Sequence, residues 1–301
     1  MKAGIIGAGA LGLLYSHSFH EHEIDFVIYE VNSEIVDDIK KNGINLLTGG
    51  ISKIIRPIID SSPEILHDAD IIFLFVKSYS TLDAINDIKD SINQNSIIIS
   101  LQNGLGNVEE INKFIDMDRI VYGSTTIGAA KSSSSTVIAG GSGIINIGGA
   151  DKKNIAKVNS LLKESGFDSH IVDDPDPVVW NKAIINAGIN PIAAILKMPN
   201  GKILSNQHAL TLQENIIKEA VDAAIANKIE IKFDEILQIT RDVCKKTSEN
   251  LCSMLQDIQN NRQTEIESIN GKIIKYGEQA GINMQFNKSV YLLIKSMENT
   301  K

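Results

Sequence analysis

Cysteine is scarce in this chain of 301 residues, which contains only Cys244 and Cys252. They follow no metal-binding or redox spacing and cannot form a disulfide framework, so we expect a protein of a reducing cytoplasm. Long apolar runs are also missing, because none approaches the roughly 18 residues that a membrane-spanning helix requires. The chain passes directly from Met1 into a strand-like run, Lys2–Ile6. We therefore expect neither a membrane anchor nor a secretion signal.

An excess of basic residues is missing as well, since 29 lysines and arginines face 37 aspartates and glutamates. The net charge of −8 repels nucleic acids and anionic membranes, so neither is an expected partner. Any anionic ligand must be held by local groups. The six histidines include no His-x-x-x-His pair, and we predict no metal site. His17, His20 and His22 are expected at exposed positions on or just after the first helix.

The first half of the chain alternates short apolar strands with helices, which predicts a parallel, doubly wound α/β sheet. The predicted strands are Ala3–Ile6, Ile24–Tyr29, Ile71–Val76, Ser96–Leu101 and Arg119–Thr126, and the predicted helices are Leu11–Phe19 and Ser33–Lys40, with Ser33 as the N-cap. Gly43–Ile59 indicates a β insertion, and Val137–Gly149 indicates a hairpin that closes the sheet. The serine-rich stretch Lys131–Ser135 is expected to be a mobile loop.

A glycine-rich motif stands between the first strand and the first helix, and consists of Gly7, Ala8, Gly9, Ala10, Leu11 and Gly12. Gly7 permits a tight turn, Gly9 lets the backbone approach a pyrophosphate, and Gly12 lets the helix pack on the strand. Glu30 ends the second strand, near the spacing expected of an acid that binds the ribose of a dinucleotide. The motif in this context predicts a Rossmann-type nucleotide site. The alternative is a tight turn without a nucleotide and an incidental surface glutamate.

The pattern changes at Asp173–Pro177, where two prolines among acidic residues indicate a domain boundary. We predict a dinucleotide-binding Rossmann domain over residues 1–172 and an all-helical domain, carrying the substrate and catalytic site, over residues 173–301. The expected helices of the second domain are Val178–Leu196, His208–Asn227, Phe233–Cys244, Asn250–Ala280 and Asn287–Met297.

Two polar residues follow other predicted strands, namely Lys77 and the Asn103 of Gln102-Asn103-Gly104. Ligands of open α/β sheets bind outside the carboxyl ends of strands. The lysine could therefore reach a cofactor or substrate, and the asparagine could hold a carboxamide or a carbonyl. A solvated lysine and a simple Asn-Gly turn explain the two residues equally well.

In the second half, Lys182, Asn186 and Asn190 recur at intervals of four and share one face of an otherwise apolar helix. Buried polar groups need partners, which either a structural network or an oxygen-rich substrate would supply. A second polar stripe contains Ser253, and Glu265 lies twelve residues further on along what the pattern predicts to be the same helix. Spacing alone favours a structural role for each of these residues.

In their order along the chain, these motifs resemble the ketopantoate reductase family over nearly the whole sequence. The resembling segments are Gly7–Gly12, Lys77, Gln102–Gly104, the helix from Lys182 to Pro191, Pro199–Gly201, Ser253–Asp257, Thr264–Ile266 and Asn270–Gly271. The resemblance implies an oxidoreductase that transfers hydride from a reduced nicotinamide cofactor to the 2-keto group of 2-dehydropantoate, giving pantoate for pantothenate and coenzyme A biosynthesis.

The resemblance also implies site residues. Lys182 would be the general acid, and Glu265 would be a carboxylate that orients the substrate or assists the reaction. Lys77 and Asn103 would serve the cofactor end of the site. The residues implied to bind substrate are Asn103, Lys182, Asn186, Asn190, Asn200, Ser253 and Glu265.

Two departures from the family stand out. Met284-Gln285 replaces an expected Thr-Pro, so the last helix is expected to start differently. Members that use NADPH often carry a basic residue where this chain has Glu30. A carboxylate there favours the ribose hydroxyls of NADH over the phosphate of NADPH, so we predict NADH although the family habit favours NADPH.

The sequence leaves two alternatives open. A related two-domain reductase could act on another 2-keto acid, because the side chains that shape the pocket are scattered along the chain. A non-catalytic nucleotide-sensing protein could keep the Rossmann domain, although it would have no need for both Lys182 and Glu265. A helical C-terminal half could support a homodimer, but no decisive patch is visible in the sequence.

Overall fold

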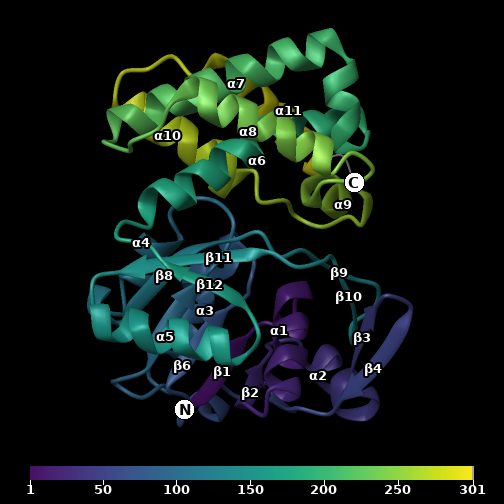
Figure 1. Ribbon diagram of the computed structural model, residues 1–301, viewed down its shortest axis with the longest axis vertical. Coiled ribbons are helices and arrows are strands. Elements are labelled where there is room, and N and C mark those ends of the chain that lie inside the picture. Colours follow the sequence, from purple (N-terminus) through teal and green to yellow (C-terminus); the bar gives the residue numbers. More distant parts are fainter. Residues whose placement is uncertain (300–301) are drawn as a thin grey trace. The chain divides into compact units, whose positions relative to one another are not determined.

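The computed structural model describes residues 1–299, and the chain divides into two compact units (Figure 1). The first unit comprises Met1–Gln102 and Asn107–Pro175. The second comprises the chain from Asp176 on, together with the short segment Asn103–Gly106. This segment follows a strand of the first unit, yet the Leu105 amide donates to a carbonyl of the second unit at 2.8 Å. Asn103, the polar residue that the sequence placed after a strand, therefore belongs to the helical second unit.

The core of the first unit is an eight-stranded sheet. Its strands lie in the order β12 (Asp168–Ile171), β11 (Ile144–Gly149), β8 (Ile120–Thr125), β7 (Ile97–Ser100), β6 (Ile71–Leu74), β1 (Lys2–Ile6), β2 (Asp25–Tyr29) and β5 (Ile58–Asp60). Every neighbouring pair is parallel except β8 and β11. The strand order reverses between β1 and β6, which confirms the doubly wound sheet. Ligands of such sheets bind at this switch point.

Apolar residues on both faces explain the continuous hydrophobic runs of the central strands. In β6, Ile71 and Phe73 belong to one core, whereas Ile72 and Leu74 belong to the core on the opposite face. Helices α1, α2 and α5 contribute to the first core, and α3 and α4 contribute to the second. The helices of this unit are α1 (Ala10–Glu21), α2 (Ser33–Asn42), α3 (Thr81–Ile88), α4 (Asn107–Ile111) and α5 (Lys152–Glu164), with the short 3₁₀ helices η1 (Pro63–Leu66), η2 (Ser78–Ser80) and η3 (Met117–Arg119).

A second sheet of four strands lies beside α1. Its strands lie in the order β4 (Ile51–Ile55), β3 (Ile44–Thr48), β10 (Thr136–Ala139) and β9 (Ala129–Lys131), and α1 contacts three of them. The β insertion predicted for Gly43–Ile59 is therefore present. Lys131 was expected in a mobile loop, but it ends strand β9.

The hairpin predicted for Val137–Gly149 is wrong, because β10 joins the small sheet and β11 joins the large one. The glycine-rich segment between them carries the chain from one sheet to the other. A Cβ at Gly140 would lie 2.8 Å from the backbone of Gly128, and one at Gly143 would lie 2.5 Å from the Ile127 amide. The glycines thus serve close backbone approach, which strand periodicity cannot distinguish from a hairpin turn.

The described residues of the second unit form helices joined by irregular segments and contain no strand, and none of these helices is both long and apolar enough to cross a membrane. It contains α6 (Asp176–Leu196), the 3₁₀ helix η4 (Asn200–Ser205), α7 (Gln207–Ala226), α8 (Phe233–Lys246), α9 (Ser253–Gln259), the π-helical turn η5 (Glu267–Gly271), α10 (Lys272–Gln279) and α11 (Gln285–Asn299). The single helix predicted for Asn250–Ala280 is wrong. Helix α9 ends at Gln259, and Asn261 takes a left-handed φ of +54°. Glu265 lies in the irregular segment that follows.

Two predictions in the first unit need correction. Helix α2 is capped by Asn32 rather than Ser33, since the Asn32 side chain accepts hydrogen bonds from two first-turn amides at 2.9 and 3.3 Å. His17 is buried instead of exposed, and its Nε2 lies 2.9 Å from the Ile44 carbonyl. Desolvation lowers the pKa of His17, so this side chain links α1 to the small sheet as a neutral imidazole.

The last helix starts without a proline. Helix α11 begins at Gln285, and the carboxylate of Glu219 in α7 accepts the amides of Phe286 and Asn287 at 2.9 Å each. A buried carboxylate at a helix N-terminus satisfies unpaired amides and interacts favourably with the helix dipole. The departure at Met284-Gln285 is therefore compensated by α7.

Candidate functional site

The glycine-rich loop joins β1 to α1 through a turn that side chains would not permit. Gly7 has a φ of +93°, and its amide donates to the Tyr29 carbonyl at 2.9 Å. A Cβ at Gly12 would lie 2.1 Å from the Gly7 carbonyl oxygen, so only glycine lets α1 start this close to the strand. Gly9 is the N-cap of α1 and carries no capping side chain. The first amides of the helix are thus left for a ligand or solvent.

Glu30 lies at the end of β2, directly beside this loop. One carboxylate oxygen accepts the Ala8 amide at 2.8 Å, and the other accepts the Asn32 amide at 2.9 Å. The residue is only 9% exposed. Each oxygen keeps further lone pairs, so the carboxylate can still accept hydroxyl donors while it holds the loop.

A cavity of about 520 Å³ opens beside the glycine loop, at the switch point of the sheet. Its lining includes Gly7, Gly9, Glu30, Lys77 and Lys131. Lys77 follows β6, as the sequence predicted. Lys131 was not singled out by its sequence context, yet its Nζ donates to the Ala8 carbonyl at 2.9 Å. The pairing of β9 with β10 brings this lysine to the cavity, and no local sequence signal reveals that pairing.

Gln102 was quoted in the Gln-Asn-Gly motif, but the sequence assigned it no role of its own. Its side-chain amide donates to the Val76 carbonyl and to the Thr81 hydroxyl, both at 2.9 Å. These bonds tie the ends of β6 and β7 together beside the start of α3. The Gln-Asn-Gly motif therefore has two functions, because Gln102 fixes the sheet edge while Asn103 joins the helical unit.

In the helical unit, α6 carries Lys182, Asn186 and Asn190 on successive turns and packs against α9, η4 and η5. Asn190 is only 6% exposed. Burial lowers the pKa of the Lys182 ammonium to about 8, and the nearby carboxylate of Glu265 acts in the opposite direction. A lysine in this state exchanges protons readily near neutral pH.

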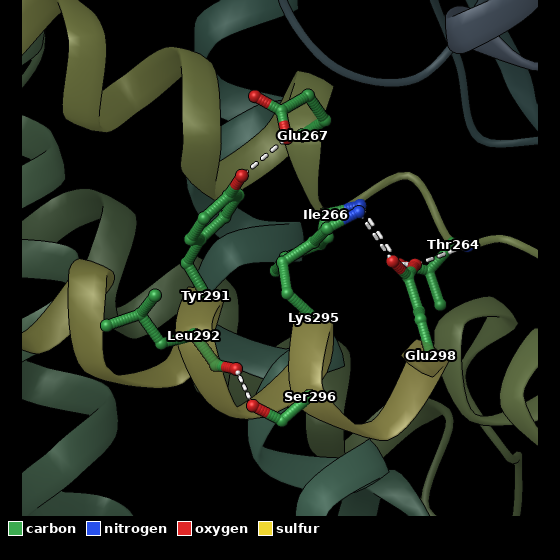
Figure 2. A network of polar contacts seen from close by, with 8 residues as sticks. All are labelled: Thr264, Ile266, Glu267, Tyr291, Leu292, Lys295, Ser296 and Glu298. Atoms are coloured by element: carbon green, nitrogen blue, oxygen red, sulfur yellow. Dashed lines mark hydrogen bonds and ion pairs between the residues drawn. The ribbon is translucent and has the colours of Figure 1, made fainter. Parts of the chain in front are cut away.

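Glu265 is buried, with 6% of its surface exposed, and it lies just before η5. The Asn103 Nδ2 donates to its Oε2 at 3.3 Å. The structure therefore brings together three predicted site residues, Asn103, Lys182 and Glu265, from three separate parts of the sequence. Figure 2 shows the polar contacts that surround the neighbouring residues Thr264 and Ile266.

Asn200 and Ser253 lie at the starts of neighbouring elements. Asn200 begins η4 and is buried, and its Nδ2 donates to the Thr247 hydroxyl at 3.0 Å. Its Oδ1 is buried and has no hydrogen-bond partner within the described part of the chain. Ser253 is exposed and begins α9, which is joined to α6 where the Cys252 thiol donates to the Asn190 carbonyl at 3.4 Å. Between residues 1 and 299, no group of three or more histidine, cysteine, aspartate or glutamate side chains could hold a metal ion.

Comparison with known proteins covers both units. Residues 3–152 match the family described as Ketopantoate reductase PanE/ApbA, and residues 175–298 match the family described as Ketopantoate reductase PanE/ApbA C terminal. The 2-dehydropantoate 2-reductase of Pyrococcus horikoshii is 34% identical over 99% of this chain and 98% of its own length. That of Archaeoglobus fulgidus is 31% identical over the same shares.

A solved structure is similar over the same extent. The ternary structure of D-mandelate dehydrogenase with NADH and anilino(oxo)acetate has a TM-score of 0.95 and is 27% identical, covering 100% of this chain and 99% of that one. Together with the two family matches, which span most of both units, these likenesses show that the chain belongs to the ketopantoate reductase family.

Proposed function

We propose that this protein is a cytoplasmic 2-dehydropantoate 2-reductase that reduces the 2-keto group of its substrate to a hydroxyl group. The observation that carries the proposal is the desolvated Lys182 ammonium next to the buried carboxylate of Glu265. A protein that only sensed a nucleotide would have no use for this proton donor. The names of the full-length relatives support the choice of substrate.

The cofactor fits the first unit. The bare N-cap at Gly9, the cavity beside it and the carboxylate of Glu30 provide a phosphate site and an acceptor for ribose hydroxyls. A bound reduced nicotinamide would supply a hydride to the keto carbon. Lys77 lines the same cavity and would contact the cofactor, and Asn103 would serve the cofactor and substrate side.

Lys182 would act as the general acid. When hydride reaches the keto carbon, the electron pair of the carbonyl bond moves to oxygen, and the alkoxide takes a proton from the Lys182 Nζ. The neutral amine then regains a proton from solvent. Because its pKa is lowered to about 8, the ammonium donates more readily than an ordinary lysine would.

The remaining polar residues would bind the carboxylate and hydroxyl of the substrate. Asn186 and Asn190 lie on the same helix as Lys182, and Ser253 begins a helix that packs against it. The unpaired, buried Oδ1 of Asn200 needs a donor, which a substrate hydroxyl could supply. Glu265 would orient the substrate beside Lys182.

A second candidate activity is reduction of another 2-keto acid, favoured by the likeness to D-mandelate dehydrogenase. Comparing kcat/KM for ketopantoate and phenylglyoxylate with either reduced cofactor separates the two candidates. We expect ketopantoate to be the better substrate by at least about tenfold, since one well-placed hydrogen bond is worth that much. A preference for phenylglyoxylate would assign the second activity. The reaction should also proceed in the presence of a metal chelator. If the chelator abolished activity and a divalent ion restored it, the mechanism proposed here would be wrong.

The role of Lys182 as general acid predicts how kcat/KM depends on pH. The general acid must be protonated, so kcat/KM for keto-acid reduction should stay level below about pH 7 and fall as the pH rises through about 8. Oxidation of the hydroxy acid should show the opposite trend. Lys182→Ala should lower turnover about 10²- to 10⁴-fold and leave the Kd for NADH unchanged. A variant with wild-type turnover would remove Lys182 from the reaction.

The geometry of the glycine loop predicts that Gly12→Ala and Gly9→Ala differ in their effect on stability. Gly12→Ala would place a Cβ 2.1 Å from a backbone oxygen, so it should lower stability by about 1–3 kcal/mol and also weaken cofactor binding. Gly9→Ala meets only the Phe75 carbonyl, at 3.3 Å, so it should fold normally and lose cofactor affinity alone. Thermal unfolding and NADH titration distinguish the two variants. Equal affinity for NADH in wild type and Gly9→Ala would place the cofactor elsewhere.

Cofactor choice is predicted from Glu30. We propose that NADH is preferred over NADPH by at least about tenfold in kcat/KM, because each phosphate charge about 4 Å from a carboxylate costs roughly 1–4 kcal/mol. Glu30→Arg should remove or reverse the preference. Lys131 in the same cavity opposes this effect, so Lys131→Met should sharpen the preference for NADH. A clear NADPH preference in the wild type would show that Lys131, Lys77 or another cation outweighs Glu30.

A further inference from the structure

We propose that Glu298, in the last turn of α11, is a positioning residue that holds Glu265 in place for substrate binding. The inference rests on the function proposed above, because it concerns the capture of a 2-keto acid by Glu265. Glu298 belongs to none of the segments on which the family resemblance rests. It lies 33 residues beyond Glu265 in the sequence, so only the fold brings it to the site.

The contact between Glu298 and Thr264 is direct and partly buried (Figure 2). One oxygen of Glu298, Oε1, accepts both the Thr264 amide at 2.8 Å and the Thr264 hydroxyl at 2.6 Å. The Glu298 side chain is 8% exposed and Thr264 is 1% exposed. Hydrogen bonds to an ionised acceptor are stronger than neutral ones, particularly where water is excluded.

The Thr264 hydroxyl extends this contact past Glu265. Its oxygen accepts the Ile266 amide at 3.2 Å. The amides on both sides of Glu265 are therefore fixed by one pair of side chains, Glu298 and Thr264. The chain before Glu265 is irregular, so no ladder of helical hydrogen bonds fixes it from that side. Glu298 thus supplies the restraint that a regular helix would otherwise provide.

The charge of Glu298 is maintained by its surroundings. Desolvation acts to raise its pKa, but hydrogen bonds from Lys295 and Thr264 outweigh it and hold the pKa below the usual range. Lys295 lies one turn earlier on α11, and its Nζ donates to Oε2 at 2.7 Å. The carboxylate therefore stays ionised and remains an acceptor for both Thr264 donors.

A neighbouring contact provides a matched control. The Tyr291 hydroxyl, also on α11, donates to the Glu267 carboxylate of η5 at 2.6 Å (Figure 2). This bond joins α11 to the first residue of η5, on the other side of Glu265 from Thr264, and it uses neither Thr264 donor. If α11 merely stabilised the segment from Thr264 to Gly271, losing either contact would have the same effect on catalysis.

The experiment compares KM, kcat and the Kd for NADH among variants of the full chain. Glu298→Ala and Thr264→Val should each raise KM for ketopantoate about 10- to 100-fold, since a displaced substrate-orienting group loses that much. The Kd for NADH should not change. Glu298→Gln keeps one oxygen that can accept both Thr264 donors but loses the charge and the acceptor for Lys295, so its KM should rise less than that of Glu298→Ala. Thr264→Ser keeps the amide and the hydroxyl, so its KM should stay within about threefold of wild type. Tyr291→Phe should leave KM unchanged.

A double-mutant cycle tests whether Glu298 acts through Glu265. Adding Glu298→Ala to Glu265→Gln should raise KM little further, because the positioned group is already altered. Hydrogen exchange at the Thr264 and Ile266 amides should become faster in Glu298→Ala and stay slow in Tyr291→Phe.

Several results would overturn the inference while leaving the proposed function intact. In an active wild type, the first such result is an unchanged KM for ketopantoate in Glu298→Ala. The second is a rise of KM in Tyr291→Phe as large as that in Glu298→Ala. The third is that the effects of Glu298→Ala and Glu265→Gln on KM add fully in the double variant. If the wild type turns over neither ketopantoate nor phenylglyoxylate, the proposed function itself fails, and the substrate role of Glu298 fails with it.

Discussion

In the helical unit a desolvated lysine ammonium lies near a carboxylate, and contacts from two other parts of the chain hold that carboxylate and its backbone. An ammonium removed from water is costly unless an opposite charge lies near it. Glu265 supplies that charge to Lys182. Because Glu265 lies in an irregular segment, its own position depends on other parts of the chain. Asn103 contacts its side chain, and Glu298 fixes the backbone around it through Thr264.

The segment Asn103–Gly106 shows how the chain brings this contact about. It leaves β7 and joins the helical unit, where Gly104 and Gly106 have φ values of +83° and +89°. A Cβ at Gly104 would lie 2.5 Å from the Ser268 hydroxyl oxygen. The glycines thus allow the backbone to approach η5 closely enough for Asn103 to reach Glu265.

In the first unit, a comparable constraint is the tight turn at the glycine loop. Ala8 is held from two sides, since its amide donates to Glu30 and its carbonyl accepts from Lys131. A carboxylate and an ammonium therefore share one cavity and would act in opposite directions on a phosphate of the cofactor.

The sequence by itself determined the class of the fold, because hydrophobic periodicity and the spacing of Gly7, Gly9 and Gly12 are local properties of the chain. It also indicated Lys182 and Glu265, although only through motifs in the order of a known family. Tertiary structure alone decided which strands pair, so the hairpin predicted for Val137–Gly149 was wrong, and the break in the helix predicted for Asn250–Ala280 was missed. It also brought Lys131 and Glu298 to their sites. Both contacts join residues far apart in sequence, and the local pattern around a residue carries no information about a partner that only folding brings near.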